Sequence, residues 1–157
     1  MKGIVIMSDS TQTDSRKTNS REGPVHASGG VSKKKGRILI VDDEETVRQH
    51  LSDMLQSFGH EVYIAMSSIE ALEAFRARPL DYDIVITDQT MPYLTGLTLA
   101  DQLRQIRPDI SVILCTGYTE LISAEEASFF GIKKILMKPV TLKQIQRVIE
   151  SSLQDSG

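Results

Sequence analysis

The stretch Ile38-Leu39-Ile40-Val41-Asp42-Asp43 decides the fold, because it is a short, unbroken apolar run that ends in two carboxylates. An apolar run without polar alternation is typical of a strand buried on both faces of a parallel sheet. Three more runs have this form: Ile84-Val85-Ile86 leads to Asp88, Val112-Ile113-Leu114 to Thr116, and Ile135-Leu136-Met137 to Lys138. Ligands of such sheets bind outside the carboxyl ends of the strands, so the polar residues are predicted to share one site.

Helical patterns separate these strands, and a further short strand is predicted over residues 61–65. The helices are expected over residues 45–58, 67–78, 97–106, 123–130 and 141–153. Ser67 with Glu70, and Thr141 with Gln144, have the spacing of capping boxes. Five strands that alternate with five helices predict a doubly wound α/β fold around a five-stranded parallel sheet.

The first 36 residues differ in composition from the rest of the chain. They hold seven Lys and Arg against three Asp and Glu, a net charge of +4, whereas residues 37–157 hold eleven against eighteen, a net charge of −7. The polar stretch from Ser8 to Lys35 has little to bury, which is typical of a disordered tail or linker. We therefore expect a tail over residues 1–36 and one folded domain over residues 37–155.

Composition excludes several classes of function. An acidic domain lacks the basic face that supplies most of the affinity for nucleic acid, so no nucleic-acid partner is expected. The single cysteine, Cys115, excludes an internal disulfide, and it is predicted to be a buried small hydrophobe. His50 and His60 lack partners at ligand spacing, so structural or surface roles are expected rather than metal binding. No run of ~18 apolar residues predicts membrane insertion, and the reducing cytoplasm is the expected compartment.

The predicted site combines three carboxylates with an ammonium and a hydroxyl group. Hard oxygen ligands from Asp42, Asp43 and Asp88, without histidine or thiol, favour Mg²⁺, which is often shared with a phosphate. Lys138 and Thr116 suit the oxygens of a transferring phosphoryl group. One carboxylate can then act as the nucleophile and form an aspartyl phosphate. Asp88 is the predicted nucleophile, because Asp42 and Asp43 together can anchor the metal.

Four motifs resemble those of receiver domains of response regulators in two-component phosphorelays. They are Val41-Asp42-Asp43-Glu44, Thr87-Asp88-Gln89-Thr90-Met91-Pro92, Thr116-Gly117 and Met137-Lys138-Pro139, within a resemblance that covers about residues 37–155. It implies a flavodoxin-like fold of strand order 2-1-3-4-5 and a cis Lys138–Pro139 peptide bond. It also implies that Asp88 is the phosphoacceptor and that Thr116 and Lys138 hold the phosphoryl oxygens. The implied Mg²⁺ ligands are Asp42, Asp43, Asp88 and the main-chain carbonyl of Thr90.

Other positions bear on signalling and on the lifetime of the phosphate. Ile135 stands where the family usually has an aromatic switch residue, three positions before the lysine of the fifth strand. Gln89 and Tyr118 are expected at the rim of the site, where Tyr118 and Thr90 would restrict the access of water. Packing of Tyr118 against the neighbouring helix is an equal alternative. The sequence of residues 114–118 further resembles receivers at the carboxyl ends of hybrid sensor kinases.

The resemblance implies a phosphoacceptor rather than an enzyme. Its phosphodonor would be a histidine kinase or a histidine phosphotransfer protein, and it would act on a downstream protein, as a stand-alone or detached hybrid-kinase receiver without an output domain. One alternative is a phosphorylation-independent binding module. Another is an aspartyl-phosphate phosphohydrolase, but such enzymes generally carry a second acid two residues after the nucleophile, where this chain has Thr90.

Overall fold

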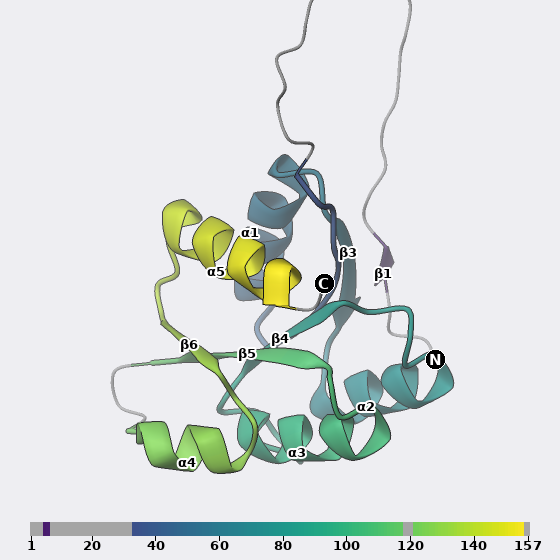
Figure 1. Ribbon diagram of the computed structural model, residues 1–157, viewed down its shortest axis with the longest axis vertical. Coiled ribbons are helices and arrows are strands. Elements are labelled where there is room, and N and C mark those ends of the chain that lie inside the picture. The colour runs from purple at the N-terminus through teal and green to yellow at the C-terminus, as the bar shows by residue number, and fades with distance from the viewer. Residues whose placement is uncertain (1–4, 7–32, 118–120, 156–157) are drawn as a thin grey trace, which may run out of the picture.

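The computed structural model describes residues 5–6, 33–117 and 121–155, and it arranges them as one sheet with helices on both faces (Figure 1). The strands are β1 (Val5–Ile6), β2 (Arg37–Val41), β3 (Glu61–Ala65), β4 (Ile84–Asp88), β5 (Ser111–Thr116) and β6 (Lys134–Met137). The helices are α1 (Glu45–Ser57), α2 (Ser68–Ala77), α3 (Gly96–Ile106), α4 (Ala124–Phe129) and α5 (Leu142–Asp155). None of these helices has the length and apolar character that a membrane span requires.

The sheet has the strand order β1-β3-β2-β4-β5-β6. The strands from β2 to β6 pair in parallel, so the order predicted as 2-1-3-4-5 is confirmed when the strands are counted from β2. The register sets Val41 opposite Ala65 on one side and opposite Thr87 on the other. The central strands therefore end at the same edge of the sheet, as the prediction of a shared site requires.

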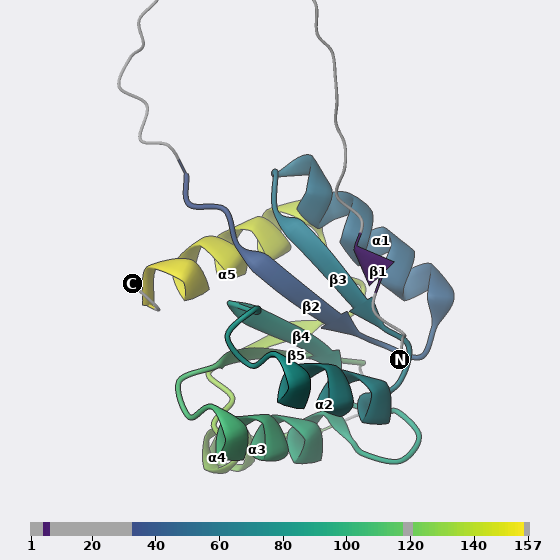
Figure 2. The same cartoon turned by 90° about the vertical axis from the view of Figure 1, so that its right-hand side faces the viewer.

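One strand lies inside the segment that was predicted as a tail. β1 pairs antiparallel with β3, with Val5 opposite Ile64 and Ile6 opposite Tyr63, at the edge of the sheet seen in Figure 2. The prediction missed this strand because it rested on the polar composition of residues 8–35. β3 is the outermost of the parallel strands, and even a two-residue extended segment can pair with the backbone N–H and C=O groups along its outer side.

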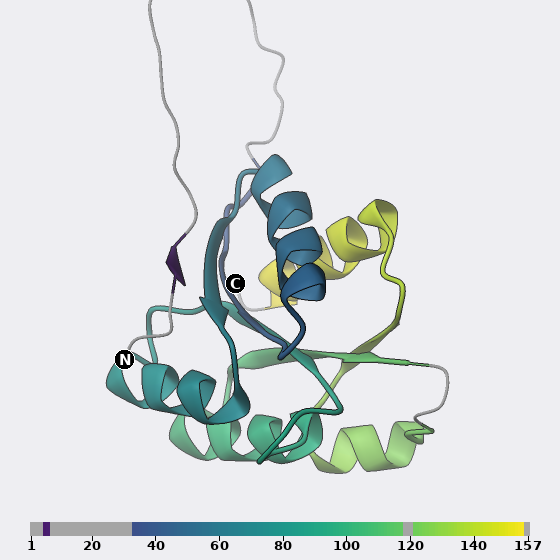
Figure 3. The same cartoon turned by 180° about the vertical axis from the view of Figure 1, so that it is seen from behind.

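Both faces of the sheet are buried along β2, β4 and β5, as their apolar runs predict. The same prediction is wrong for β6, where Ile135 and Met137 are exposed because β6 lies at the edge of the sheet. Successive residues of β2 point to opposite faces, so Ile38 and Ile40 pack with α1 and α5, whereas Leu39 and Val41 pack with the helices from α2 to α4. Figure 3 shows α1 and α5 together on one side of the sheet and the other helices on the opposite side. Two apolar clusters therefore hold the strands, and with them the polar residues at the strand ends.

The predicted starts of α2 and α5 are confirmed by side-chain caps. The Ser67 side chain accepts a hydrogen bond from the Glu70 N–H, and the Thr141 and Gln144 side chains each accept one from the other residue's N–H. After α1 the chain turns at Gly59, whose φ of 89° suits a residue without a side chain. These contacts satisfy helix-end groups that have no partner within the helix.

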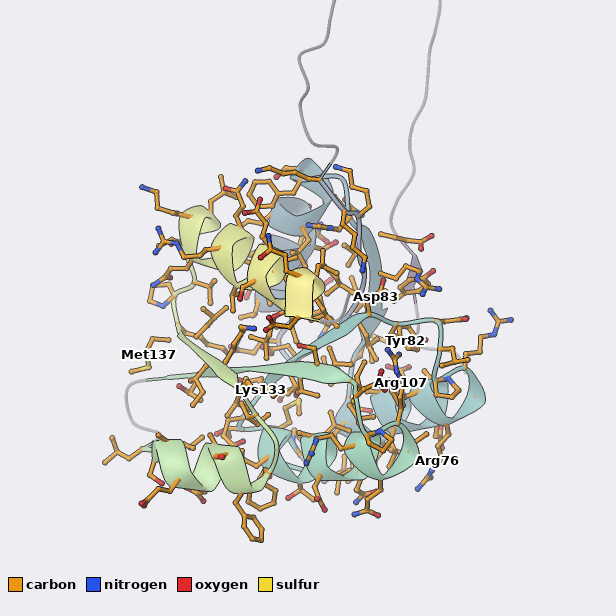
Figure 4. All side chains as sticks on the ribbon, in the orientation of Figure 1. Arg76, Tyr82, Asp83, Arg107, Lys133 and Met137 are labelled. Atoms are coloured by element: carbon orange, nitrogen blue, oxygen red, sulfur yellow. The ribbon has the colours of Figure 1, made fainter. Side chains whose placement is uncertain are left out.

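The amino-terminal edge of the sheet is tied together by charged side chains. Arg107 donates to the main-chain carbonyl of Tyr82, and the Asp83 carboxylate accepts the Arg37 N–H at 2.8 Å. Figure 4 shows Tyr82, Asp83 and Arg107 close together, at the other end of the sheet from Met137. These bonds fix the start of β4, whereas the end of β4 carries Asp88.

His60 has a structural role at the start of β3. Its imidazole is 8% exposed, and its Nδ1 atom accepts a hydrogen bond from the Gly36 N–H at 3.0 Å. Burial, reinforced by the nearby Lys35 ammonium, lowers the pKa of His60 below its ordinary value of 6.5. His50 is exposed on α1. The expectation of structural or surface roles for these two histidines is confirmed.

We expect the free energy of unfolding to fall as the pH is lowered from about 7.5 to about 5.5. In this window the unfolded chain binds a proton at His60 that the folded chain excludes, so stability is present above pH 6.5 and is lost as the pH falls through the lowered pKa. Urea unfolding at a series of pH values measures this. His60→Gln should reduce the pH dependence of the free energy of unfolding, and His50→Gln should leave that dependence unchanged. A parental pH dependence in His60→Gln would assign the effect to other groups.

Candidate functional site

The three predicted acidic residues lie together at the carboxyl edge of the sheet. Asp42 and Asp43 follow β2, and Asp88 is the last residue of β4. One carboxylate oxygen from each residue lies within 4.8 Å of the other two. Asp42 and Asp88 are buried, and Asp43 is exposed. The cluster is an acidic pocket of hard oxygen ligands that can bind a metal ion.

Lys138 follows β6 and contacts both buried carboxylates. Its Nζ atom lies 2.8 Å from Oδ1 of Asp88 and 3.3 Å from Oδ2 of Asp42. Its N–H donates to the Thr116 carbonyl at 2.8 Å, and its peptide bond to Pro139 is cis, as the resemblance implied. Burial lowers the pKa of Lys138, but the two carboxylates outweigh burial and raise the pKa to about 12. The ammonium therefore stays charged at neutral pH.

The electrostatics of Asp42 favour a bound cation. Burial raises the pKa of Asp42 above its ordinary value of 3.8, although the Glu44 N–H, 2.8 Å from Oδ1, and the Lys138 ammonium oppose this. The three carboxylates also repel one another, since a single ammonium contacts only Asp42 and Asp88. A divalent cation would relieve both costs, so the donor set fits Mg²⁺ chemically.

Thr116 is the last residue of β5 and is 2% exposed. Its hydroxyl donates to the Sδ atom of Met137 across a distance of 3.4 Å, so in this structure it is directed toward β6. Met137 and Ile135 are both partly exposed, at 43% and 40%, because they alternate with the buried Leu136. The sequence placed Met137 in a strand and in the motif Met137-Lys138-Pro139, but it did not predict this contact.

The loop between β4 and α3 carries the remaining predicted site residues. Thr90 is exposed in this loop, and its role as a carbonyl ligand stays a prediction. The side chain of Gln89 accepts the Leu97 N–H at 3.0 Å, so it caps the start of α3 instead of facing the carboxylates. Tyr118 lies outside the described residues, so its predicted place at the rim stays a prediction.

Two neighbouring side chains complete the surroundings of the site. Arg48, one turn into α1, donates to the main-chain carbonyl of Asp42 at 2.8 Å. Sequence reasoning missed this contact, although the short separation in sequence between Arg48 and the acidic pair is a usable signal. Cys115 is buried as predicted, and burial raises the pKa of its thiol to about 12. A recess of about 440 Å³ adjoins Lys138 between α1 and the segment after β6, and Val47 and Pro139 are among its lining residues.

Comparison with known proteins shows which protein family this chain is similar to. The sequence profile of the response regulator receiver domain matches residues 38–150. The sensor kinase CckA of Brucella abortus is 37% identical over 117 residues, which are 74% of this chain and 12% of CckA. The DNA-binding transcriptional regulator NtrC of Azospirillum brasilense is 34% identical over 119 residues, 76% of this chain and 24% of NtrC. This chain therefore spans only a small part of these relatives.

Solved structures of similar fold cover most of the described domain. A response regulator receiver domain protein from Clostridium thermocellum superposes with a TM-score of 0.73 at 35% identity, over 76% of this chain and 95% of that chain. A CheY-like receiver domain protein from Methanospirillum hungatei gives a TM-score of 0.71 at 28% identity, over 78% and 97% of the two chains. The match covers nearly all of each of these small proteins.

Proposed function

Because this chain belongs to the response regulator receiver domain family, we propose that it takes a phosphoryl group from a phosphohistidine onto Asp88 with the help of Mg²⁺. Receiver domains of two-component systems are phosphoacceptors, and they accept phosphate from histidine kinases. The observation that carries the proposal is the contact of Lys138 with Asp88 at 2.8 Å inside a cluster of three carboxylates. The presence of this full set supports phosphoryl transfer over a binding module that works without phosphate.

The residues divide the chemistry between them. A carboxylate oxygen of Asp88 forms a bond to phosphorus as the N–P bond of the donor breaks. The electron pair of that bond stays on the donor nitrogen, and the proton on the other ring nitrogen makes the leaving group a neutral imidazole. The Lys138 ammonium and the Thr116 hydroxyl bind the oxygens of the transferring group. Asp42, Asp43, Asp88 and the Thr90 carbonyl would hold Mg²⁺, which neutralises charge on the carboxylates and on the phosphoryl group.

The donor and the compartment are part of the same proposal. We place a histidine kinase or a histidine phosphotransfer protein as the donor, because receiver domains accept phosphate from histidine kinases. The downstream partner is proposed to be another protein, since the curated relatives include a sensor kinase and a transcriptional regulator. A lone cysteine that forms no internal disulfide is compatible with the reducing cytoplasm as the compartment.

We expect Asp43→Ala to prevent Mg²⁺-dependent phosphorylation while the domain stays folded. The substitution removes a metal ligand that is exposed, and it also removes repulsion between neighbouring carboxylates, so the free energy of unfolding should be unchanged or higher. The measurements are intact-mass spectrometry after incubation with acetyl phosphate and MgCl₂, and urea unfolding.

Glu44→Ala is the matched control, because Glu44 is the next residue and its side chain makes no cap hydrogen bond to α1. This variant should be labelled at the parental rate. If Asp43→Ala were labelled as fast as the parent, the assignment of the metal site would be wrong. If EDTA had no effect on labelling of the parent, the proposed requirement for Mg²⁺ would be wrong.

A further inference from the structure

The loop between β4 and α3 must place the Thr90 carbonyl, although Thr90 itself is exposed. The loop is fixed on the side of Gln89, whose N–H donates to the Cys115 carbonyl at 3.0 Å and whose carbonyl accepts the Gly96 N–H at 2.9 Å. On the other side of Thr90, Met91 is buried in the core. A polar anchor on this side comes from a different element, the first residue of α2.

The far side of the loop contains a strained turn at Tyr93. Tyr93 has a φ of 74°, which is uncommon for a residue with a side chain, and it is 81% exposed. The Leu94 N–H donates to the Pro92 carbonyl at 3.0 Å, so the three residues form a γ-turn of the rare type with positive φ. A turn of this kind persists only when its surroundings hold it.

Ser68 supplies the contacts that hold this turn. Its hydroxyl donates to the Pro92 carbonyl at 3.0 Å and accepts the Leu94 N–H at 3.1 Å, so it bonds on both sides of Tyr93. Ser68 is fully buried, so its hydroxyl is held beneath the turn. The packing of α2 against α3 keeps it in place.

We propose that Ser68 is a positioning residue for the metal site. By holding the turn at Tyr93, it fixes the far end of the segment whose near end is fixed at Gln89, and so it sets the position of the Thr90 carbonyl between them. Ser68 touches neither the carboxylates nor the phosphoryl group. The inference rests on the proposed function, because it assigns Ser68 a purpose only if the Thr90 carbonyl is a metal ligand.

The test uses the whole chain and MgCl₂ as the probe, with binding followed by backbone amide resonances. Ser68→Ala should weaken Mg²⁺ binding about tenfold, and exchange of the Leu94 N–H with solvent should become faster. Ser67→Ala is the matched control, because Ser67 is the preceding residue and its hydroxyl caps α2 by accepting the Glu70 N–H. It should lower stability while leaving Mg²⁺ affinity and Leu94 exchange at parental values.

A second variant separates positioning from a general loss of structure. Tyr93→Gly relieves the strain at φ 74°, so in the double variant with Ser68→Ala the turn should depend less on the hydroxyl and recover most of the lost Mg²⁺ affinity. Parental Mg²⁺ affinity in Ser68→Ala, or no recovery in the double variant, would overturn the inference while leaving the proposed function standing. A parent chain that binds no Mg²⁺ would overturn both.

Discussion

A chain carrying Asp88→Asn is expected to take up no phosphoryl group from acetyl phosphate or from a phosphorylated histidine donor. The amide keeps the shape of the side chain at the end of β4 but removes the negative charge of the nucleophile. It also removes the ion pair with Lys138, in which the two atoms lie 2.8 Å apart. Intact-mass spectrometry after incubation with donor and MgCl₂ measures the result, and circular dichroism checks that the variant is folded.

Asp53→Asn is the matched control for this loss. It makes the same change of one carboxylate to an amide on the exposed side of α1, away from the acidic cluster. It should be labelled at the parental rate. If Asp88→Asn gained phosphate as the parent does, another residue would be the acceptor and the proposed role of Asp88 would be wrong.

Gly96→Ala is expected to destabilise the fold by about 1–3 kcal/mol and to slow phosphorylation sharply. A Cβ atom at position 96 would lie 2.4 Å from the main-chain carbonyl oxygen of Asp88 and 2.6 Å from Cδ1 of Leu114. The start of α3 must then move away from β4, or the end of β4 must shift together with the phosphoacceptor. Urea unfolding gives the loss of stability, and the acetyl phosphate assay gives the change in labelling rate.

Gly36→Ala makes the same substitution where the neighbour can yield. There a Cβ atom would meet the end of the Leu153 side chain, at 2.9 Å from Cδ2, and no backbone atom is among its close contacts. This variant should lose less stability than Gly96→Ala and should keep the parental labelling rate. Equal losses in the two variants would show that the close approach at Asp88 carries no special constraint.

The parts of the fold that depend on short-range pattern were predictable from sequence. β2 is apolar without a break from Ile38 to Val41 because both faces of the sheet are covered there, and that pattern separates it from amphipathic helices. The two capping boxes gave the starts of α2 and α5 because their side chains bond within four residues. Since parallel strands end at one edge of the sheet, the same patterns also predicted that Asp42, Asp88 and Lys138 lie close together, as their contacts show.

The contacts that could not be predicted from the sequence depend on how segments far apart in the chain are placed. The pairing of β1 with β3 needs only a two-residue segment, which has no periodicity to detect. Ser68 and Pro92 are 24 positions apart, and nothing in either local sequence predicts that a hydroxyl bonds to that carbonyl. The direction of the Gln89 side chain could not be predicted either, because a polar residue beside the site can face the carboxylates or the neighbouring helix.

The bond from Thr116 to Met137 joins a buried site residue to a partly exposed side chain of β6. A thioether sulfur is a weak acceptor, so the hydroxyl is only lightly held in its present direction. Turning toward a phosphoryl oxygen would exchange that bond for a charge-assisted one about twice as strong. The sulfur would then lose its donor on the partly exposed outer side of β6, beside Ile135. The outer side of β6 would thus report what the acidic pocket holds, and no aromatic ring would be needed.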